Sequence, residues 1–301
     1  MDIATGMAER RAEKRAYLEI FFGIVLLGTG PMFVKFVAAN GTQVAFYRLL
    51  FAALMLALPA LLARRKVRTD GGSPRPAGWL IAGGIAFAIN IALWCSALNF
   101  APAAVVTLLD NTAPVWVGLF AWLALRQQPG RAYWVGLGLA VAGGALLVSN
   151  GVQGAGSWQP TGTLLSLLSG LSYAAYILIT QRARRHFSSW TYSWMVSVVG
   201  AVLLLVFGLL TGAFVEALPA RSYALIFLMS LSSQVLGWYL VNEAFGKLPP
   251  TAAAAAMVGQ PVVTALLGIF LLGELLSAWQ WMGAAVCLAG ILLAQRSAVP
   301  A

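Results

Sequence analysis

The chain has 301 residues, of which 60% are hydrophobic and only 9% are charged, and its formal net charge is +10. This composition lies far outside that of a soluble globular domain and indicates a protein that is solvated by lipid. Two cysteines and one histidine exclude a disulfide framework, a histidine metal site and a histidine-based catalytic triad. We therefore expect no catalytic residues, no metal and no cofactor.

Ten apolar runs of about 20 residues, the length that crosses roughly 30 Å of hydrocarbon as a helix, follow one another along the chain. The runs lie near residues 17–38, 42–63, 77–99, 103–125, 132–150, 160–181, 190–211, 221–245, 250–272 and 277–295. The sequence therefore predicts an all-α integral membrane protein with ten transmembrane helices. The connections are too short to hold a soluble catalytic domain, and an enzyme is not expected.

The positions of the basic residues predict the orientation of the chain. If residues 1–16 form a cytoplasmic N-terminal segment, all of the 19 Lys and Arg residues except Lys35, Arg48 and Arg221 lie on the cytoplasmic side. The positive-inside rule then also places the tail, residues 296–301, in the cytoplasm. Because the positive charge is spread over several loops, we interpret it as setting the orientation of the chain in the membrane. The expected partner is therefore the lipid bilayer rather than nucleic acid.

Two segments of the chain, residues 97–147 and 244–294, match each other without a gap at an offset of 147 positions. The matched pairs are Pro102 with Pro249, Pro114 with Pro261, Trp134 with Trp281, Gly136 with Gly283, and Gly143 with Gly290. The halves, residues 17–150 and 160–295, then hold five predicted spans each. Two equal halves with an odd number of spans must be inverted relative to one another, as in many secondary transporters.

Polar and aromatic side chains recur at helical spacing in five of the predicted spans. Such stripes face either a substrate cavity or neighbouring helices that they hydrogen-bond, and both interpretations stay open. The candidate substrate-binding residues are Asn90, Trp94, Thr107, Asp110, Asn111, Tyr173, Tyr176, Gln234, Trp238, Met257 and Gln260, and Ser169 belongs to the same stripe as Tyr173.

Three prolines are candidate hinges. A proline inside a helix removes the hydrogen bond to the carbonyl four residues earlier and kinks the helix. Pro31, Pro114 and Pro261 would free the carbonyls of Leu27, Asp110 and Met257 in this way. Tolerance of proline for packing reasons is the alternative.

Charged residues within the spans limit the classes of cargo that the protein could transport. Asp110 alone among the acidic residues lies well inside a span, which makes it a candidate site for a proton or a ligand. Lys35 and Arg48 are the only basic residues within spans, and both are expected near the outer ends, whereas phosphorylated cargo would need such groups in the cavity. Tyr173, Trp238 and their aromatic neighbours instead favour neutral amino acids or small amphipathic drugs.

Small residues mark a close helix contact. Gly136, Ala140 and Gly144 in the fifth span, and Gly283, Ala285 and Ala289 in the tenth, permit close backbone approach. Packing of the two halves within a monomer is the expected use, and a homodimer contact is the alternative.

Taken together, these residues resemble the EamA type of the drug/metabolite transporter superfamily. The resemblance rests on Gly28 with Lys35, on Arg48, and on the repeated pattern that runs from Pro261 through residues 271–274 and 280–283 to residues 289–290. It implies ten helices in two inverted five-helix repeats and a multi-pass protein of the bacterial inner membrane. The family often has a glutamate immediately before the proline at mid-helix, where this chain has Ala113 and Gln260, so proton coupling through that glutamate is not implied.

The resemblance also implies a function. The chain looks most like bacterial exporters of aromatic amino acids, so we expect a secondary transporter that exports neutral or aromatic amino acids by alternating access through a cavity between the repeats. A multidrug or other small-metabolite exporter and a passive facilitator or channel remain as alternatives.

Overall fold

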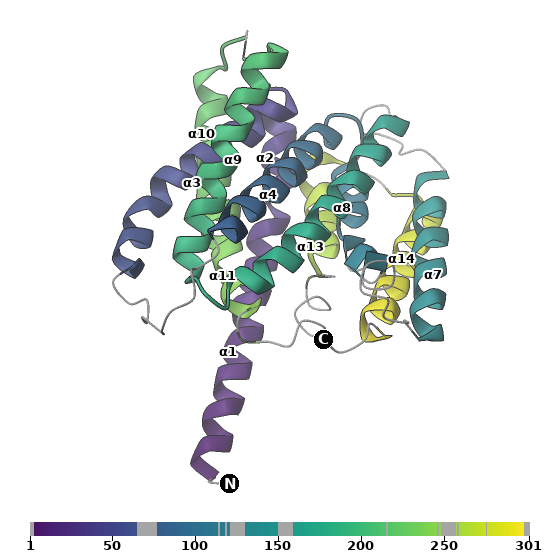
Figure 1. Ribbon diagram of the computed structural model, residues 1–301. Coiled ribbons are helices and arrows are strands. Elements are labelled where there is room, and N and C mark those ends of the chain that lie inside the picture. The colour runs from purple at the N-terminus through teal and green to yellow at the C-terminus, as the bar shows by residue number, and fades with distance from the viewer. Residues whose placement is uncertain are drawn as a thin grey trace.

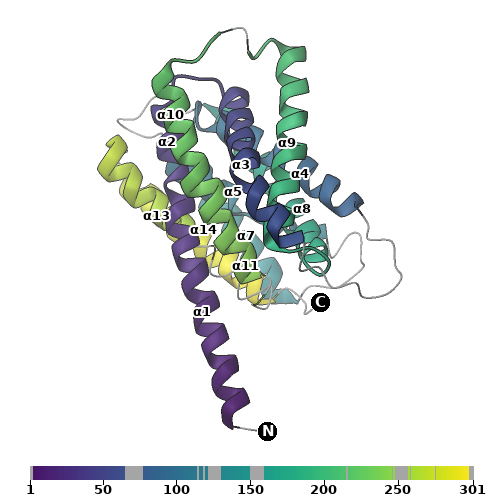
Figure 2. The same cartoon turned by 90° about the vertical axis from the view of Figure 1, so that its left-hand side faces the viewer.

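The computed structural model describes residues 3–64, 77–113, 115–117, 119–120, 130–149, 159–214, 216–245, 247, 257, 259–274 and 276–297. Every regular element in these residues is a helix (Figures 1 and 2). The first half contains α1 (Ile3–Gly28), α2 (Gly30–Phe36), α3 (Gly41–Arg64), α4 (Gly78–Ala97), α5 (Ala103–Asp110) and α7 (Arg131–Ser149). The second half contains α8 (Pro160–Ala183), α9 (Ser189–Thr211), α10 (Ala220–Met229), η1 (Ser230–Gly237), α11 (Trp238–Phe245), α13 (Gly259–Leu267), η2 (Gly268–Leu272) and α14 (Ala278–Ser297). Both η segments are π-helical.

Six described helices are long and apolar enough to cross a membrane. They span Lys14–Phe36, Gly41–Ala63, Gly78–Ala97, Pro160–Ala183, Ser189–Thr211 and Ala220–Ala244. Shorter apolar helices cover Ala103–Val117, Gly259–Leu272 and Ala278–Ala294. The prediction of a helical membrane protein is therefore confirmed, whereas the count of ten spans stays a prediction.

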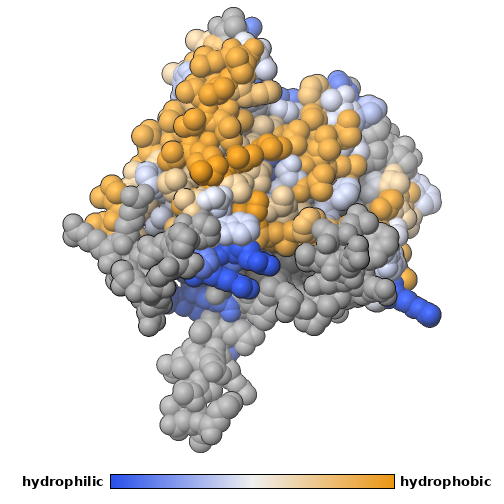
Figure 3. All heavy atoms as spheres, in the orientation of Figure 1, coloured by the Kyte–Doolittle hydropathy of each residue, from blue (hydrophilic) through white to orange (hydrophobic). Residues whose placement is uncertain are grey.

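Large apolar side chains cover the outside of the bundle. Leu54, Leu58, Leu210 and Phe270 are each at least 66% exposed, and in water such a surface would cost much free energy. Figure 3 shows hydrophobic residues gathered over the upper part of one face, with hydrophilic residues below them. This distribution suits a bundle whose middle lies in hydrocarbon and whose polar end lies at the interface.

In the described residues, two of the predicted spans are broken by a turn between helical segments. The first breaks at Thr29, between α1 and α2, where the Thr29 hydroxyl donates to the Leu26 carbonyl over 2.6 Å. Pro31 lies in the first turn of α2, where a missing N–H costs nothing. The fourth breaks after Asp110, since residues 111–112 form a turn; Pro114 lies outside the described residues.

The third candidate hinge, Pro261, is buried and lies in the first turn of α13, which is described from Gly259 onward. Helix α13 packs against α1 and α5, and the Thr264 hydroxyl lies 3.5 Å from the Gly28 carbonyl that it donates to. The middle of α13 thus lies against the end of α1, close to the break at Thr29.

Helices α7 and α14 pack backbone against backbone (Figure 1). A Cβ on Gly290 would lie 2.3 Å from the Ala140 nitrogen, and one on Gly143 would lie 2.3 Å from the Cys287 nitrogen. The expected contact between the halves is therefore present, but its register differs from the prediction.

The face that α14 presents to α7 carries Gly283, Cys287 and Gly290, whereas Ala285 and Ala289 are exposed. Gly144 faces Leu109 of α5 rather than α14. The predicted choice of Gly144, Ala285 and Ala289 was wrong. Ala285 follows Gly283 by two residues and so faces the other side of the helix, a second step of four residues carries Gly144 past the contact, and alternating steps of four and three residues follow it.

The N-terminus of α3 is fixed by a reciprocal cap. The Asn40 side chain accepts from the Gln43 N–H over 2.9 Å, and the Gln43 side chain accepts from the Asn40 N–H over 3.3 Å. Their amide groups also donate to the Ala213 and Glu216 carbonyls over 2.9 and 2.8 Å. The cap satisfies helix-end N–H groups and ties α3 to the segment that follows α9.

Candidate functional site

The candidate site is built around α4, where Asn90 and Trp94 lie one turn apart and are buried. The Asn90 amide donates to the Asp110 carboxylate at the end of α5 over 3.0 Å. The Ser169 hydroxyl of α8 donates to the same oxygen, Oδ1, over 2.5 Å, and Asn90 also donates to the Ser169 carbonyl over 3.1 Å. Three helices thus converge on one buried carboxylate.

Two features bring α5 into this position. Gly170 follows Ser169, and a Cβ there would lie 2.9 Å from the Leu109 carbonyl oxygen, so only glycine allows α8 to approach the end of α5 so closely. At the other end of α5, the Glu274 carboxylate accepts from the Ala103 N–H over 3.0 Å. A carboxylate at that position satisfies a free N–H of the first turn and interacts favourably with the helix dipole.

A second polar group surrounds Arg48 of α3, which is only 2% exposed. Its Nε donates to the Gln234 side chain over 3.0 Å, and its Nη2 donates to the Ser233 hydroxyl over 3.2 Å. Its guanidinium carbon lies 5.5 Å from the centre of the Trp94 ring, within the range of a cation–π interaction. Trp94, which lies against Arg48, and Asn90, which donates to Asp110, are one turn apart on α4, so the two polar groups are neighbours.

The partners of Arg48 lie in a π-helical segment. Ser233 and Gln234 belong to η1, which interrupts the helix between α10 and α11. A π-helical turn widens the backbone spiral and is frequent at functional sites. Figure 2 shows α10 and α11 following one another along the bundle, so the irregular turn sits in the middle of a predicted span.

An aromatic cluster adjoins both polar groups. Trp238 packs edge-on against Phe87, Tyr173 and Tyr176, with ring centres 5.3, 5.8 and 5.5 Å apart. Phe87 also packs against Tyr176 at 4.7 Å, and Tyr176 stacks on Tyr192 at 6.1 Å. These rings belong to helices from both halves of the chain, and they offer apolar surface with polar edges.

Several polar atoms of the site lack partners. Within the part of the chain that the structure describes, Thr107 Oγ1, Tyr173 Oη and Trp238 Nε1 are buried without a hydrogen bond. A buried polar group without a partner costs about 1–3 kcal/mol, so such groups call for a ligand or a water molecule. All three residues were predicted site residues.

The other predicted site residues are Asn111, Met257 and Gln260. Asn111 is buried, but its amide donates to the Thr107 carbonyl of its own helix over 2.9 Å. Met257 is buried among the hydrophobic residues that also include Trp94 and Trp238. Gln260 is half-buried on α13. Among the hydrogen bonds of the described residues, none joins these three side chains to Asp110 or Arg48.

Arg48 is the residue that sequence reasoning missed. Its position near the outer end of a span stays a prediction, but it was not expected at the site, whereas it is buried in the third turn of α3 and contacts Gln234 and Trp94. A basic residue inside an apolar run is itself a signal of function. Lys35, in contrast, donates to the Ala101 carbonyl over 2.9 Å and takes no part in the site.

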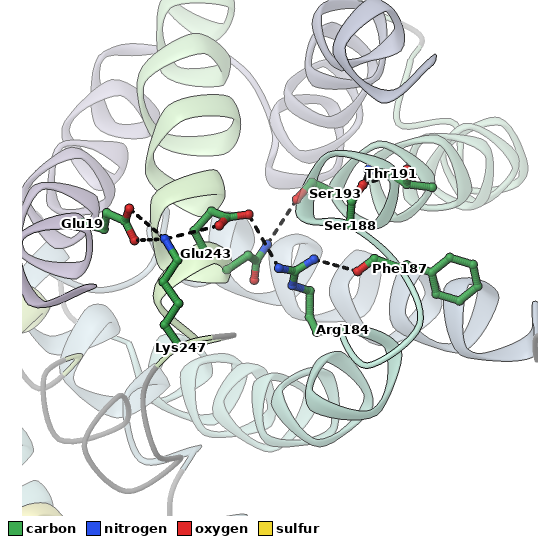
Figure 4. A network of polar contacts seen from close by, with 9 residues as sticks. Glu19, Arg184, Phe187, Ser188, Thr191, Ser193, Glu243 and Lys247 are labelled. Carbon is green, nitrogen blue, oxygen red and sulfur yellow. Dashed lines mark hydrogen bonds and ion pairs between the residues drawn. The ribbon is translucent and has the colours of Figure 1, made fainter. Parts of the chain in front are cut away.

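Ion pairs join the helix ends on the predicted cytoplasmic side. Lys247 lies 2.7 Å from Glu19 of α1 and 3.4 Å from Glu243 of α11, and Arg184 lies 3.6 Å from Glu243 (Figure 4). Partial burial lowers the pKa of Arg184, and the Glu243 carboxylate opposes that shift. The network ties α1, α11 and the end of α8 together.

Comparisons with known proteins agree with this picture. The sequence model of the EamA-like transporter family matches residues 14–149 and again residues 160–295. An uncharacterized transporter of Archaeoglobus fulgidus is 26% identical over 277 residues, which is 92% of this chain and 95% of that protein. The uncharacterized transporter YwfM of Bacillus subtilis is 28% identical over 184 residues, which is 61% of each chain.

One solved crystal structure has the same fold. It superimposes with a TM-score of 0.64 at 17% identity and covers 94% of this chain and 97% of that one.

Proposed function

The chain belongs to the EamA-like transporter family, and we propose that this membrane transporter exports neutral or aromatic amino acids by alternating access. The proposed architecture has ten spans in two inverted five-helix repeats, residues 17–150 and 160–295. Both termini are placed in the cytoplasm and the protein in the bacterial inner membrane, as a monomer. The two separate matches of the family model, one in each half, support the duplication.

One observation carries the substrate assignment: the buried groups around α4 combine charges with an aromatic cluster. Asp110 and Arg48 are at most 9% exposed, and Tyr173 and Trp238 each have a buried polar atom without a partner. Apolar surface with a few fixed polar groups is typical of sites for small organic ligands. An amino acid with an aromatic side chain would use both kinds of surface.

The breaks in the helices support movement between states. Near the site, the backbone departs from the helix at two places, the break at Thr29 and the turn after Asp110. Non-helical backbone at membrane depth is tolerated where it is buried in protein or lines a water-filled path. Pro31, Pro114 and Pro261 are proposed as hinges on this ground.

Transport by the purified protein in liposomes tests the substrate assignment. We expect labelled phenylalanine, tryptophan or another neutral amino acid to move by a saturable process, and lysine, glutamate and sugar phosphates to move at the rate of empty liposomes. The same panel with and without a pH gradient shows whether protons drive transport. If drugs or sugars move and no amino acid does, the substrate assignment is wrong although the family stands.

A further inference from the structure

The buried charge of Arg48 is held by neutral partners. Its side-chain hydrogen bonds go to Gln234, to Ser233 and to the Cys95 thiol, and in the described part of the chain it forms no ion pair. A guanidinium group keeps its charge in proteins, and a buried ion without a counter-ion is costly. The site is therefore poised for an anionic group.

The geometry of the guanidinium leaves donors for such a group. It carries five N–H bonds in a planar fork that matches the two oxygens of a carboxylate, and its three side-chain partners, Gln234, Ser233 and Cys95, do not occupy all of them. Trp94 lies against the guanidinium and limits its orientation, so the fork is held before the ligand arrives.

Asp110 is the opposite charge of the same site. Asn90 and Ser169, which are both neutral, donate hydrogen bonds to its Oδ1. Arg48 and Asp110 lie on either side of the α4 turn that carries Asn90 and Trp94, and they form no ion pair in the described residues. A ligand with one negative and one positive group would neutralise both buried charges.

We propose that Arg48 binds the carboxylate of the cargo while Asp110 binds its ammonium group, so that the site selects zwitterions of the α-amino-acid type. This inference rests on the proposed function and names the groups that recognise the cargo. The unpartnered Tyr173 hydroxyl belongs to α8, one turn after the Ser169 that donates to Asp110, and lies on the ammonium side. The Trp238 ring, which packs edge-on against Tyr173, offers surface to the side chain of the cargo.

Competition for uptake of labelled phenylalanine tests the inference on the wild-type protein. Phenylalaninamide keeps the ammonium group but replaces the carboxylate by a neutral amide, and N-acetylphenylalanine keeps the carboxylate but loses the ammonium charge. Each should compete about 10- to 100-fold less well than unlabelled phenylalanine, because each loses a charged hydrogen bond. Equal competition by phenylalaninamide would overturn the inference.

Substitution of Arg48 assigns the carboxylate to this residue. Arg48→Gln should raise the KM for phenylalanine about 10- to 100-fold and change inhibition by phenylalaninamide by less than about 2-fold. Arg48→Lys keeps the charge but not the fork, so its KM should be intermediate. The matched control is Arg221→Gln, an exposed arginine in the first turn of α10, whose KM should be unchanged.

A general loss of folding would act differently, because it lowers the amount of active protein and weakens the binding of all ligands equally. If the wild type carries no amino acid, the proposed function fails and this inference fails with it. If the wild type carries phenylalanine and the KM of Arg48→Gln or Arg48→Lys equals that of the wild type, only the inference fails.

Discussion

Transport by the Asp110→Asn variant should fall at least about 10-fold, while the protein still folds. Asparagine retains a side-chain oxygen that can accept from Asn90 and Ser169, the two donors that hold Asp110. It removes the negative charge, and the loss of one charged hydrogen bond to cargo or proton corresponds to about 1.5–3 kcal/mol. Initial rates of phenylalanine counterflow at several pH values measure the effect.

The pH series separates a fixed charge from a titrating one. If Asp110 carries a proton during the cycle, the pH dependence of the wild type should flatten in Asp110→Asn. Glu216→Gln is the matched control, since it removes an exposed carboxylate outside the site, and its rate should be that of the wild type. Normal transport by Asp110→Asn at every pH would refute the role of Asp110.

The Gly290→Ala variant should be destabilised by about 3 kcal/mol or more, because the added methyl group has no space. Its Cβ would lie 2.3 Å from the Ala140 nitrogen and 2.6 Å from the Gly136 carbonyl oxygen. These are backbone atoms of α7 and cannot rotate away, so α7 and α14 must separate. We expect a large fall in the melting temperature and aggregation on size exclusion in detergent.

Gly138→Ala is the control for this contact. Gly138 lies on α7, the helix against which Gly290 packs, and nothing lies within 4 Å of a Cβ added there. Alanine is the better helix former by about 0.5–1 kcal/mol, so Gly138→Ala should be at least as stable as the wild type. If the melting temperature of Gly290→Ala equals that of the wild type, α7 and α14 do not pack in this way.

Much of the site could be predicted because the membrane makes buried polar groups rare and therefore informative. Asn90, Asp110 and Ser169 stood out as polar residues in apolar runs, and the structure joins them by hydrogen bonds. The sequence did not reveal which stripes face each other, because periodicity describes one helix at a time and pairing depends on packing between helices.

The errors have the same origin. Arg48 was left out of the site because of its distance from the end of its span, but Ser233 and Gln234 of a π-helical segment accept its hydrogen bonds, and hydropathy carries no signal for that segment. The fourth span was predicted to kink at Pro114, whereas a turn already follows Asp110, because local hydrogen bonds such as that from the Thr112 hydroxyl to the Leu109 carbonyl compete with the helix.

Counterflow in liposomes tests the central claim, that the buried groups of both halves form the substrate site of a carrier. Liposomes loaded with unlabelled phenylalanine should accumulate labelled phenylalanine transiently above its external concentration. The reason is that a carrier that has released unlabelled phenylalanine outside returns to the inside with labelled phenylalanine bound. This overshoot should be lost in both Asp110→Asn and Arg48→Gln. A channel would only equilibrate the label, so equilibration without overshoot in the wild type, or an unchanged overshoot in both variants, would contradict the account.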